Sequence, residues 1–198
     1  WREVPIDRSC LGSIAKLSEP SVYQAFIVKP EKDSAEEFNA KLFAARKIAE
    51  HRIDDSELSE KDHFYVCSLS TNTIIYKGLL MPNDINSYYP DLNDDDVVTK
   101  LALVHQRFST NTFPTWDLAQ PFRYMCHNGE INTLRGNLSR MKAREELFEN
   151  EFFGEDLKKI IPITMEGKSD SASMDMALEL LLHTGRSLPE AMMIMVPE

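Results

Sequence analysis

Two apolar runs that each end in a cluster of polar residues place the strongest constraint on this chain. Residues 101–104 are followed by His105-Gln-Arg-Phe-Ser-Thr-Asn-Thr-Phe-Pro-Thr-Trp116, and residues 122–125 by Cys126-His-Asn-Gly-Glu-Ile-Asn132. A short apolar run bounded by polar residues is typical of a buried strand. Adjacent strands that stop together would bring an arginine, several hydroxyls and an Asn-Gly pair to one sheet edge. Such groups can bind a carboxylate and a carbonyl, so the pattern predicts a small-molecule site.

The order of the remaining patterns predicts the fold class. Strand patterns dominate the first part of the chain and helix patterns the last, which favours an α+β layered fold over a doubly wound one. We find no repeat or linker, and therefore expect residues 1–198 to belong to a single domain with no internal boundary. The expected strands are 22–28, 64–69, 74–77, 101–108 and 122–128. The expected helices are 35–51, a short one within 81–90, 134–149, one that opens at 169 and is stopped by Gly185, and one from 188.

Composition excludes several classes of protein. The chain has 22 Lys and Arg against 32 Asp and Glu, a net charge of -10, which argues against a nucleic-acid or anionic-membrane surface. No apolar run reaches the roughly 20 residues that span a bilayer. Three cysteines at irregular spacing without a CxxC motif favour a reducing compartment such as the cytoplasm.

We expect no metal ion or cofactor in this chain. His105, Cys126, His127 and Glu130 are possible ligands, but alternating residues of a strand face opposite sides and no second cluster completes a set. The acidic stretch 91–96 lacks the glycine and closing glutamate of a calcium loop, so we interpret it as exposed.

Arg107 is the first candidate for binding a substrate. Its guanidinium needs an anionic partner, and bidentate binding of a carboxylate matches its shape. A salt bridge to one of the chain's acidic residues is the alternative, and the neighbouring Thr110, Asn111 and Thr112 favour a ligand.

Asn128 and Gly129 have two interpretations. Asn-Gly is the strongest short signal for a two-residue hairpin. The same pair can also form an oxyanion hole, because an amide side chain and a backbone N–H can both donate to a developing negative oxygen. The spacing of the residues leaves both interpretations open.

Asp170 likewise has two possible roles: capping the helix that follows it, or binding an ammonium group whose carboxylate lies at Arg107. Cys126 would need a base to act as a nucleophile, and His127 points to the other face of a strand. Cys10 lies in an extended polar segment without a base, and we assign it no role.

Three motifs resemble the glutaminase domain found in the large subunit of glutamate synthases. They are Val104-His-Gln-Arg-Phe-Ser-Thr-Asn-Thr-Phe-Pro-Thr-Trp116, His127-Asn-Gly-Glu-Ile-Asn-Thr-Leu-Arg-Gly-Asn137 and Ser169-Asp-Ser-Ala-Ser-Met-Asp175; the opening Trp1-Arg-Glu-Val-Pro5 is similar too. The resemblance extends over the whole chain. It implies a class II glutamine amidotransferase with the N-terminal-nucleophile hydrolase fold, a four-layer αββα sandwich.

The resemblance also implies a reaction and the residues that serve it. A class II amidotransferase hydrolyses glutamine to glutamate and ammonia through the thiolate of an N-terminal cysteine, whose α-amine acts as base. Arg107 matches the residue that holds the substrate α-carboxylate, with Thr110 beside it, and Asp170 matches the residue that binds the α-ammonium. The Asn128 side chain and the Gly129 backbone N–H match the oxyanion hole.

The family's nucleophilic cysteine is the first residue of the mature enzyme, whereas position 1 of this sequence is Trp1. We therefore expect a central fragment that lacks the nucleophile and the N-terminal strands, and that is inactive alone. The parent enzyme implied by the resemblance carries FMN, an iron-sulfur cluster and NAD(P)H or ferredoxin as electron donor, and passes ammonia to 2-oxoglutarate.

The expected partners are glutamine or glutamate, the rest of the large subunit and a small subunit, with no nucleic acid or membrane. The expected location is the cytoplasm, or a plastid in a photosynthetic eukaryote. Two alternatives stay open: a non-catalytic amino-acid-binding or regulatory module, and a different class II amidotransferase.

Overall fold

The protein consists of α-helices, short 3-10 helices, two short strands and long segments without regular secondary structure. The structure is a computed structural model that describes residues 1–108, 113–150, 153–165 and 167–196. Its strands and α-helices are β1 (Arg2–Glu3), α1 (Ser13–Leu17), β2 (Tyr23–Gln24), α2 (Ala35–Asp54), α3 (Ile85–Tyr88), α4 (Leu134–Glu145), α5 (Leu157–Ile160), α6 (Asp170–His183) and α7 (Leu188–Met195). Short 3-10 helices occupy Arg8–Cys10, Lys61–His63, Pro82–Asp84, Pro90–Asn93 and Gly154–Asp156.

Local capping signals explain where the long helices begin. Ser34 and Glu37 form a reciprocal capping box: the Glu37 N–H donates to Ser34 Oγ at 3.1 Å and the Ser34 N–H to Glu37 Oε2 at 2.8 Å. The predicted helix 35–51 is thereby confirmed, and it continues to Asp54. The Ser169 hydroxyl accepts the Ala172 N–H at 3.1 Å, so Ser169 is the N-cap of α6 and Asp170 is its first residue.

The C-terminal helices also follow the sequence signals. Gly185, with φ of 91°, follows the end of α6 in the left-handed conformation that glycine adopts without strain. Helix α7 begins after Ser187 with a proline in its first turn, as predicted. Helix α4 is confirmed but ends at Glu145, four residues before the predicted end.

Most of the predicted strands are wrong. In the described residues, segments 64–69, 74–77 and 101–108 form no strand, and 22–28 is reduced to β2. Segment 122–128 bends at Arg123 and Tyr124, where the Phe122 N–H donates to the Met125 carbonyl at 2.9 Å. β1 and β2 pair antiparallel, with Arg2 opposite Gln24 and Glu3 opposite Tyr23. A helix satisfies its backbone internally, whereas a strand needs a neighbour in register. The four-layer sandwich is therefore not confirmed in this structure.

Side chains accept hydrogen bonds from backbone N–H groups in and beside these segments, where a strand would have a neighbouring strand. Asp175 accepts the Arg123 N–H at 3.0 Å and the Tyr124 N–H at 2.8 Å. Asn39 of α2 accepts the Thr71 N–H at 2.8 Å. Buried backbone groups need such partners, so these contacts hold the extended segments against α2 and α6.

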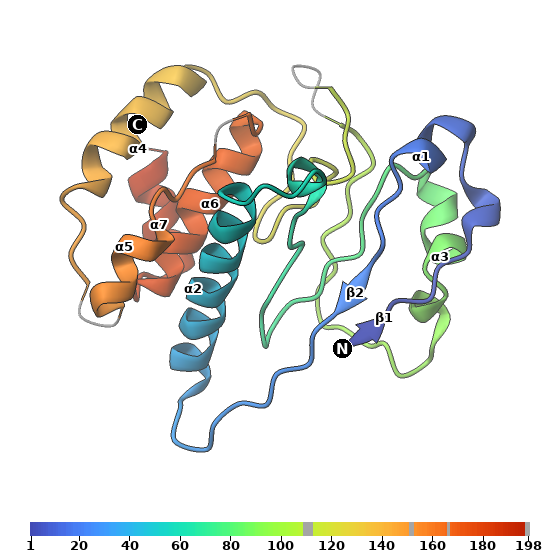
Figure 1. The fold of residues 1–198 in the computed structure, drawn as a ribbon, viewed down its shortest axis with the longest axis horizontal. Helices are drawn as coiled ribbons and strands as arrows, with labels where there is room; N and C mark the ends of the chain where they lie inside the picture. Colours follow the sequence, from blue (N-terminus) through green and yellow to red (C-terminus); the bar gives the residue numbers. More distant parts are fainter. Residues whose placement is uncertain (109–112, 151–152, 166, 197–198) are drawn as a thin grey trace.

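The elements are arranged as three adjoining regions. Helices α2, α4, α5, α6 and α7 lie on one side, the short helices α1 and α3 on the other, and the extended segments between them (Figure 1). A core lies in each outer region. The first contains Ala40, Phe43, Ala44, Phe153, Leu157, Ile160, Ile163 and Leu180, and the second Val4, Leu11, Tyr88, Tyr89 and Trp116.

Close packing of the second core depends on a glycine. A Cβ built on Gly78 would lie 2.3 Å from Trp116 Cζ3, a distance that no real contact adopts. Gly78 therefore allows the Trp116 ring to lie against the backbone. No helix in the described part of the chain combines the length and apolar character that a bilayer crossing requires.

A buried charge cluster joins the helices to the extended region. Arg46 of α2 is 2% exposed and pairs with Glu50 at 2.7 Å and with Glu179 of α6 at 2.5 Å. Arg123, which precedes the second polar cluster, lies 3.3 Å from Glu50 and donates to the Val66 carbonyl at 2.6 Å. Opposite charges compensate the cost of burial here and fix segment 122–124 against both helices.

Lys47 is buried beside this cluster and gives a pH-dependent prediction. It is 1% exposed, and Nζ donates to the Ile163 carbonyl at 3.0 Å. Burial lowers the pKa of Lys47 from 10.5 to about 8. Between pH 8 and 10.5 the Lys47 side chain is protonated in the unfolded chain but deprotonated in the folded protein. The free energy of unfolding therefore rises with pH in this range.

We expect the free energy of unfolding to gain about 2 kcal/mol from this group between pH 7 and 9.5. Lys47→Met should remove that part of the pH dependence, as measured by urea unfolding across this range. Lys159→Met is the matched control, because the Lys159 side chain is 60% exposed. Equal pH profiles for wild type and Lys47→Met would contradict the prediction.

Candidate functional site

Arg107 lies at the end of an extended segment with its side chain exposed. Its backbone N–H donates to His105 Nδ1 at 3.1 Å. Among the described residues no carboxylate forms an ion pair with its guanidinium, so the salt-bridge alternative finds no support there. Thr110, Asn111 and Thr112 lie outside the described residues.

His105 connects this segment to the second polar cluster. Because His105 Nδ1 accepts the Arg107 N–H, the hydrogen of the neutral ring is on Nε2. His105 Nε2 lies 3.0 Å from the His127 carbonyl oxygen and donates to it. The backbone that carries Arg107 is thereby held beside the backbone that carries Asn128.

Asn128 and Gly129 lie in an exposed bend directly after His127. Gln120 holds the approach to this bend: Oε1 accepts the His127 N–H at 2.9 Å and Nε2 donates to the His127 carbonyl at 3.2 Å. No strand in the described part of the chain flanks the Asn-Gly pair. The hairpin interpretation is therefore wrong, and the bend is fixed by side chains instead.

Asp170 anchors the far side of the same bend. Oδ2 accepts the Ile131 N–H at 2.9 Å, while Oδ1 accepts the Ser171 N–H at 2.7 Å and the Ser171 hydroxyl at 3.1 Å. Partial burial by itself raises the pKa of Asp170, but the hydrogen bonds from Ile131 and Ser171 outweigh it and hold the pKa below its ordinary value. Asp170 is therefore a carboxylate with partners for both oxygens, at the start of α6.

Ser171 closes the connection between Asp170 and His127. Its hydroxyl donates to Asp170, so His127 Nε2, at 2.6 Å from Ser171 Oγ, is the donor in the second hydrogen bond. The structure thus joins Arg107, the Asn128–Gly129 bend and Asp170 through His105, His127 and Ser171.

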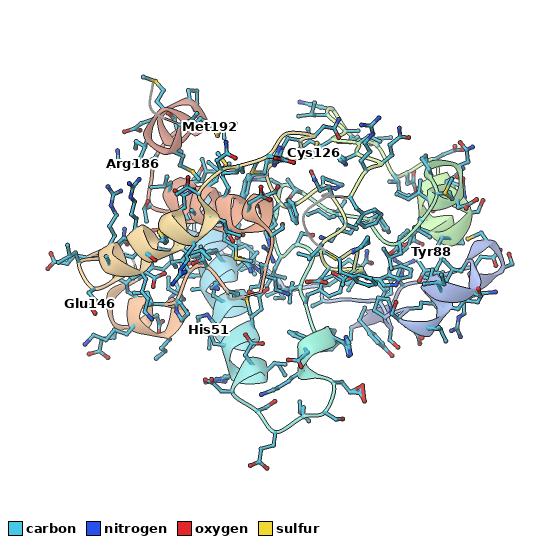
Figure 2. The ribbon with its side chains drawn as sticks, turned by 90° about the horizontal axis from the view of Figure 1, so that it is seen from above. His51, Tyr88, Cys126, Glu146, Arg186 and Met192 are labelled. Carbon is cyan, nitrogen blue, oxygen red and sulfur yellow. The ribbon has the colours of Figure 1, made fainter. Side chains whose placement is uncertain are left out.

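The cysteines do not form a nucleophile with a base in the described residues. Burial raises the pKa of the Cys10 thiol and of the Cys67 thiol, which disfavours the reactive thiolate. Cys126 is half-buried and lies between the long helices and the opposite region that contains Tyr88 (Figure 2). The neighbouring His127 ring is bonded to Ser171 instead.

His105, Cys126, His127 and Glu130 are the possible metal ligands that the sequence offers. In the described ranges, no group of three His, Cys, Asp or Glu side chains is placed to hold a metal ion. The two histidines act as hydrogen-bonding residues of the site.

Three residues that position the site were not singled out from the sequence: Gln120, Ser171 and Asp175. Ser171 and Asp175 belong to the motif 169–175, where their spacing places them on one helix and gives a signal. Gln120 precedes the apolar run 122–125, and no sequence pattern marks it as a site residue. Its contact with His127 depends on a turn of the chain that no local pattern predicts.

Comparison with known proteins identifies the family. The family described as "Glutamine amidotransferases class-II" matches residues 1–198. The chain belongs to the class II glutamine amidotransferases.

Individual members of this class II family are similar over the full chain. A glutamate synthase [NADH] from Saccharomyces cerevisiae is 47% identical over 199 residues, covering 100% of this chain and 9% of that protein. A glutamate synthase [NADPH] large chain from Bacillus subtilis is 48% identical over 200 residues, covering 100% of this chain and 13% of its own length. A ferredoxin-dependent glutamate synthase from Antithamnion sp. is 42% identical over 198 residues, covering 100% and 13%. The chain thus spans 9–13% of the length of these class II relatives.

Proposed function

We propose that the chain is part of the glutaminase domain of a glutamate synthase, which hydrolyses glutamine to glutamate and ammonia for transfer to 2-oxoglutarate. The observation that carries the proposal is the hydrogen-bonded connection from Arg107 through His127 to Asp170. It supports the proposal because the Arg107 backbone, the Asn128–Gly129 bend and the Asp170 carboxylate are linked by hydrogen bonds. Similarity to glutamate synthases over the full chain supports the same assignment.

In this proposal Arg107 and Asp170 bind opposite ends of the amino-acid group. Arg107 has no competing ion pair among the described residues and is free to pair with the α-carboxylate. Asp170 stays ionised because its pKa is lowered, and a carboxylate has further lone pairs for an α-ammonium after accepting Ile131 and Ser171. Thr110 contributes beside Arg107.

Asn128 and Gly129 would act on the reacting carbonyl. A thiolate attacks the amide carbon of the glutamine side chain, and the carbonyl oxygen becomes negative. The Asn128 amide and the Gly129 N–H donate to that oxygen. The C–N bond then breaks as the α-amine of the N-terminal cysteine returns the thiol proton to the leaving nitrogen, which departs as ammonia. Water then hydrolyses the thioester to glutamate and the free thiol.

We assign the attacking thiolate to an N-terminal cysteine outside these 198 residues rather than to Cys10, Cys67 or Cys126. Supporting this, Cys10 and Cys67 have raised pKa values and Cys126 has no base bonded to it among the described residues. We likewise propose that the extended segments belong to a four-layer αββα sandwich whose other strands come from the same polypeptide.

The relatives carry the names of NADH, NADPH and ferredoxin-dependent enzymes. We propose that the parent of this chain uses one of these donors, with FMN and an iron-sulfur cluster outside residues 1–198. The rest of the large subunit and a small subunit would be its partners, in the cytoplasm or a plastid.

Ammonia release and calorimetry test the proposal. The full-length polypeptide should release ammonia from glutamine, and the 198-residue chain alone should release none. Arg107→Ala in the full-length protein should weaken glutamate binding by about tenfold to a hundredfold, the loss of a charge-assisted hydrogen-bonded pair. Arg140→Ala is the control, because Arg140 is exposed on α4.

Other outcomes would overturn the proposal. Ammonia release by the 198-residue chain that is lost on Cys126→Ala would make an internal thiol the nucleophile. Amino-acid binding lost on Arg107→Ala, without turnover by the full-length protein, would favour a regulatory module. Transfer of ammonia to an acceptor other than 2-oxoglutarate would identify a different class II amidotransferase.

A further inference from the structure

The backbone and the ring of His127 are both fixed by side chains that have no assigned role in the reaction. Gln120 is 8% exposed and bonds to the N–H and the carbonyl of His127 with the two ends of one amide. Ser171 bonds to the ring at Nε2. His127 is therefore restrained from opposite directions, although it belongs to neither a helix nor a strand.

The position of His127 decides where the next two residues lie. Asn128 and Gly129 follow it directly, and a Cβ built on Gly129 would lie 3.4 Å from His127 Nδ1. The ring therefore packs beside the Gly129 backbone. At the other end of the bend, the Ile131 N–H is bonded to Asp170. The bend is held at these two ends, and residues 128–130 form no hydrogen bond with one another in the described part of the chain.

We propose that Gln120 and Ser171 are positioning residues that aim the Asn128 amide and the Gly129 N–H through His127. This inference rests on the proposed glutaminase function. Neither side chain needs to touch the substrate. An oxyanion hole works only if its donors are fixed before the charge develops, and a bend without ladder hydrogen bonds cannot fix them itself.

The same network links substrate binding to the oxyanion hole. Ser171 donates to Asp170, the residue proposed for the α-ammonium, and accepts from His127. Asp170 also accepts the Ile131 N–H beyond the bend. A substrate that binds Asp170 therefore contacts the residue that anchors the bend. The α-ammonium site and the Asn128–Gly129 bend are thereby held in a fixed relative position.

Glutaminase kinetics of the full-length polypeptide test the proposal. Gln120→Leu removes both backbone contacts and should lower kcat about tenfold to a hundredfold, the cost of donors misplaced by about 1 Å. Ser171→Ala should lower kcat about tenfold, and Ser171→Thr, which keeps the hydroxyl, should restore most of it. KM should change less than about threefold in each, because the donors act on the transition state.

A matched control and a double-mutant cycle separate positioning from a general structural role. Ser173→Ala changes the same residue type in the same helix, where the hydroxyl is bonded only to the Ser169 carbonyl in the described contacts. It should leave kcat within about twofold. In an Asn128→Ala background, Gln120→Leu should cost several-fold less than in wild type, because the donor it aims is already absent.

The outcomes distinguish this inference from the function on which it rests. A wild-type protein without glutaminase activity overturns both. An active wild type with unchanged kcat in Gln120→Leu and Ser171→Ala, or with losses fully additive to Asn128→Ala, overturns the positioning role alone. If Gln120→Leu fails to fold, as judged by lost glutamate binding, Ser171→Ala and Ser171→Thr decide the question.

Discussion

Asn128→Ala is expected to reduce kcat for glutamine hydrolysis by roughly 10²–10³ in the full-length polypeptide, the loss that follows removal of one oxyanion-hole donor. The Asn128 side chain is exposed at the bend and forms no hydrogen bond within the described residues, so its amide is available to a ligand. KM should change little, since the donor strengthens its contact only when the carbonyl oxygen becomes negative.

Two further variants sharpen this prediction. Asn128→Asp keeps the shape of the side chain but replaces the donor by a negative oxygen, and should lose at least as much activity as Asn128→Ala. Asn86→Ala is the control, because Asn86 is an exposed asparagine of α3 whose bonds are to Asn93 in the same surface turn. A raised KM with unchanged kcat in Asn128→Ala would show ground-state binding instead.

Glu179→Ala is expected to lower the free energy of unfolding by about 3–5 kcal/mol, because it removes one of the two carboxylates that compensate the buried charge of Arg46. Arg46 lies between Glu50 and Glu179, and its side chain is 1% exposed. Burial alone would lower the pKa of Arg46, but Glu179 and Glu50 outweigh it and raise the pKa. The guanidinium stays charged after the substitution because arginine is not deprotonated in proteins. Urea unfolding followed by circular dichroism measures the loss.

An exposed ion pair provides the comparison. Lys159 and Asp156 lie 2.6 Å apart, with side chains 60% and 53% exposed, and Lys159→Ala should change stability by less than about 1 kcal/mol. The double variant Arg46→Met and Glu179→Met should recover much of the loss, because it removes two opposite buried charges together and leaves Glu50 paired with Arg123. A loss below about 1 kcal/mol in Glu179→Ala would mean that Glu50 alone compensates Arg46.

The helices could be predicted because their signals are local. Ser34 with Glu37 starts α2, Ser169 starts α6, and Gly185 follows its end. Each of these residues acts on backbone groups within one turn of itself. A single sequence therefore contains the information needed for these helices. The ends of α2 and α4 differ from the prediction by a few residues, and α1 was not predicted.

The extended segments could not be predicted correctly as strands for the same physical reason. Segments 101–108 and 122–128 have apolar strand-like composition, but composition does not supply a neighbour in register. In the structure, Asp175 binds the N–H groups of Arg123 and Tyr124, and Gln120 binds His127. Asp175 lies on α6 and Gln120 in a loop, and no spacing in the sequence identifies either as a partner.

The candidate site divides in the same way. The sequence by itself determined the residue types, through motifs that contain Arg107, Asn128, Gly129 and Asp170, and the family comparison confirms the resemblance on which they rest. Whether the motifs lie side by side depends on tertiary packing. Hydrogen bonds over separations of 22 residues between His105 and His127, and 44 residues between His127 and Ser171, bring the motifs together. Contacts at such separations depend on how whole elements pack, which a local pattern of residues does not specify.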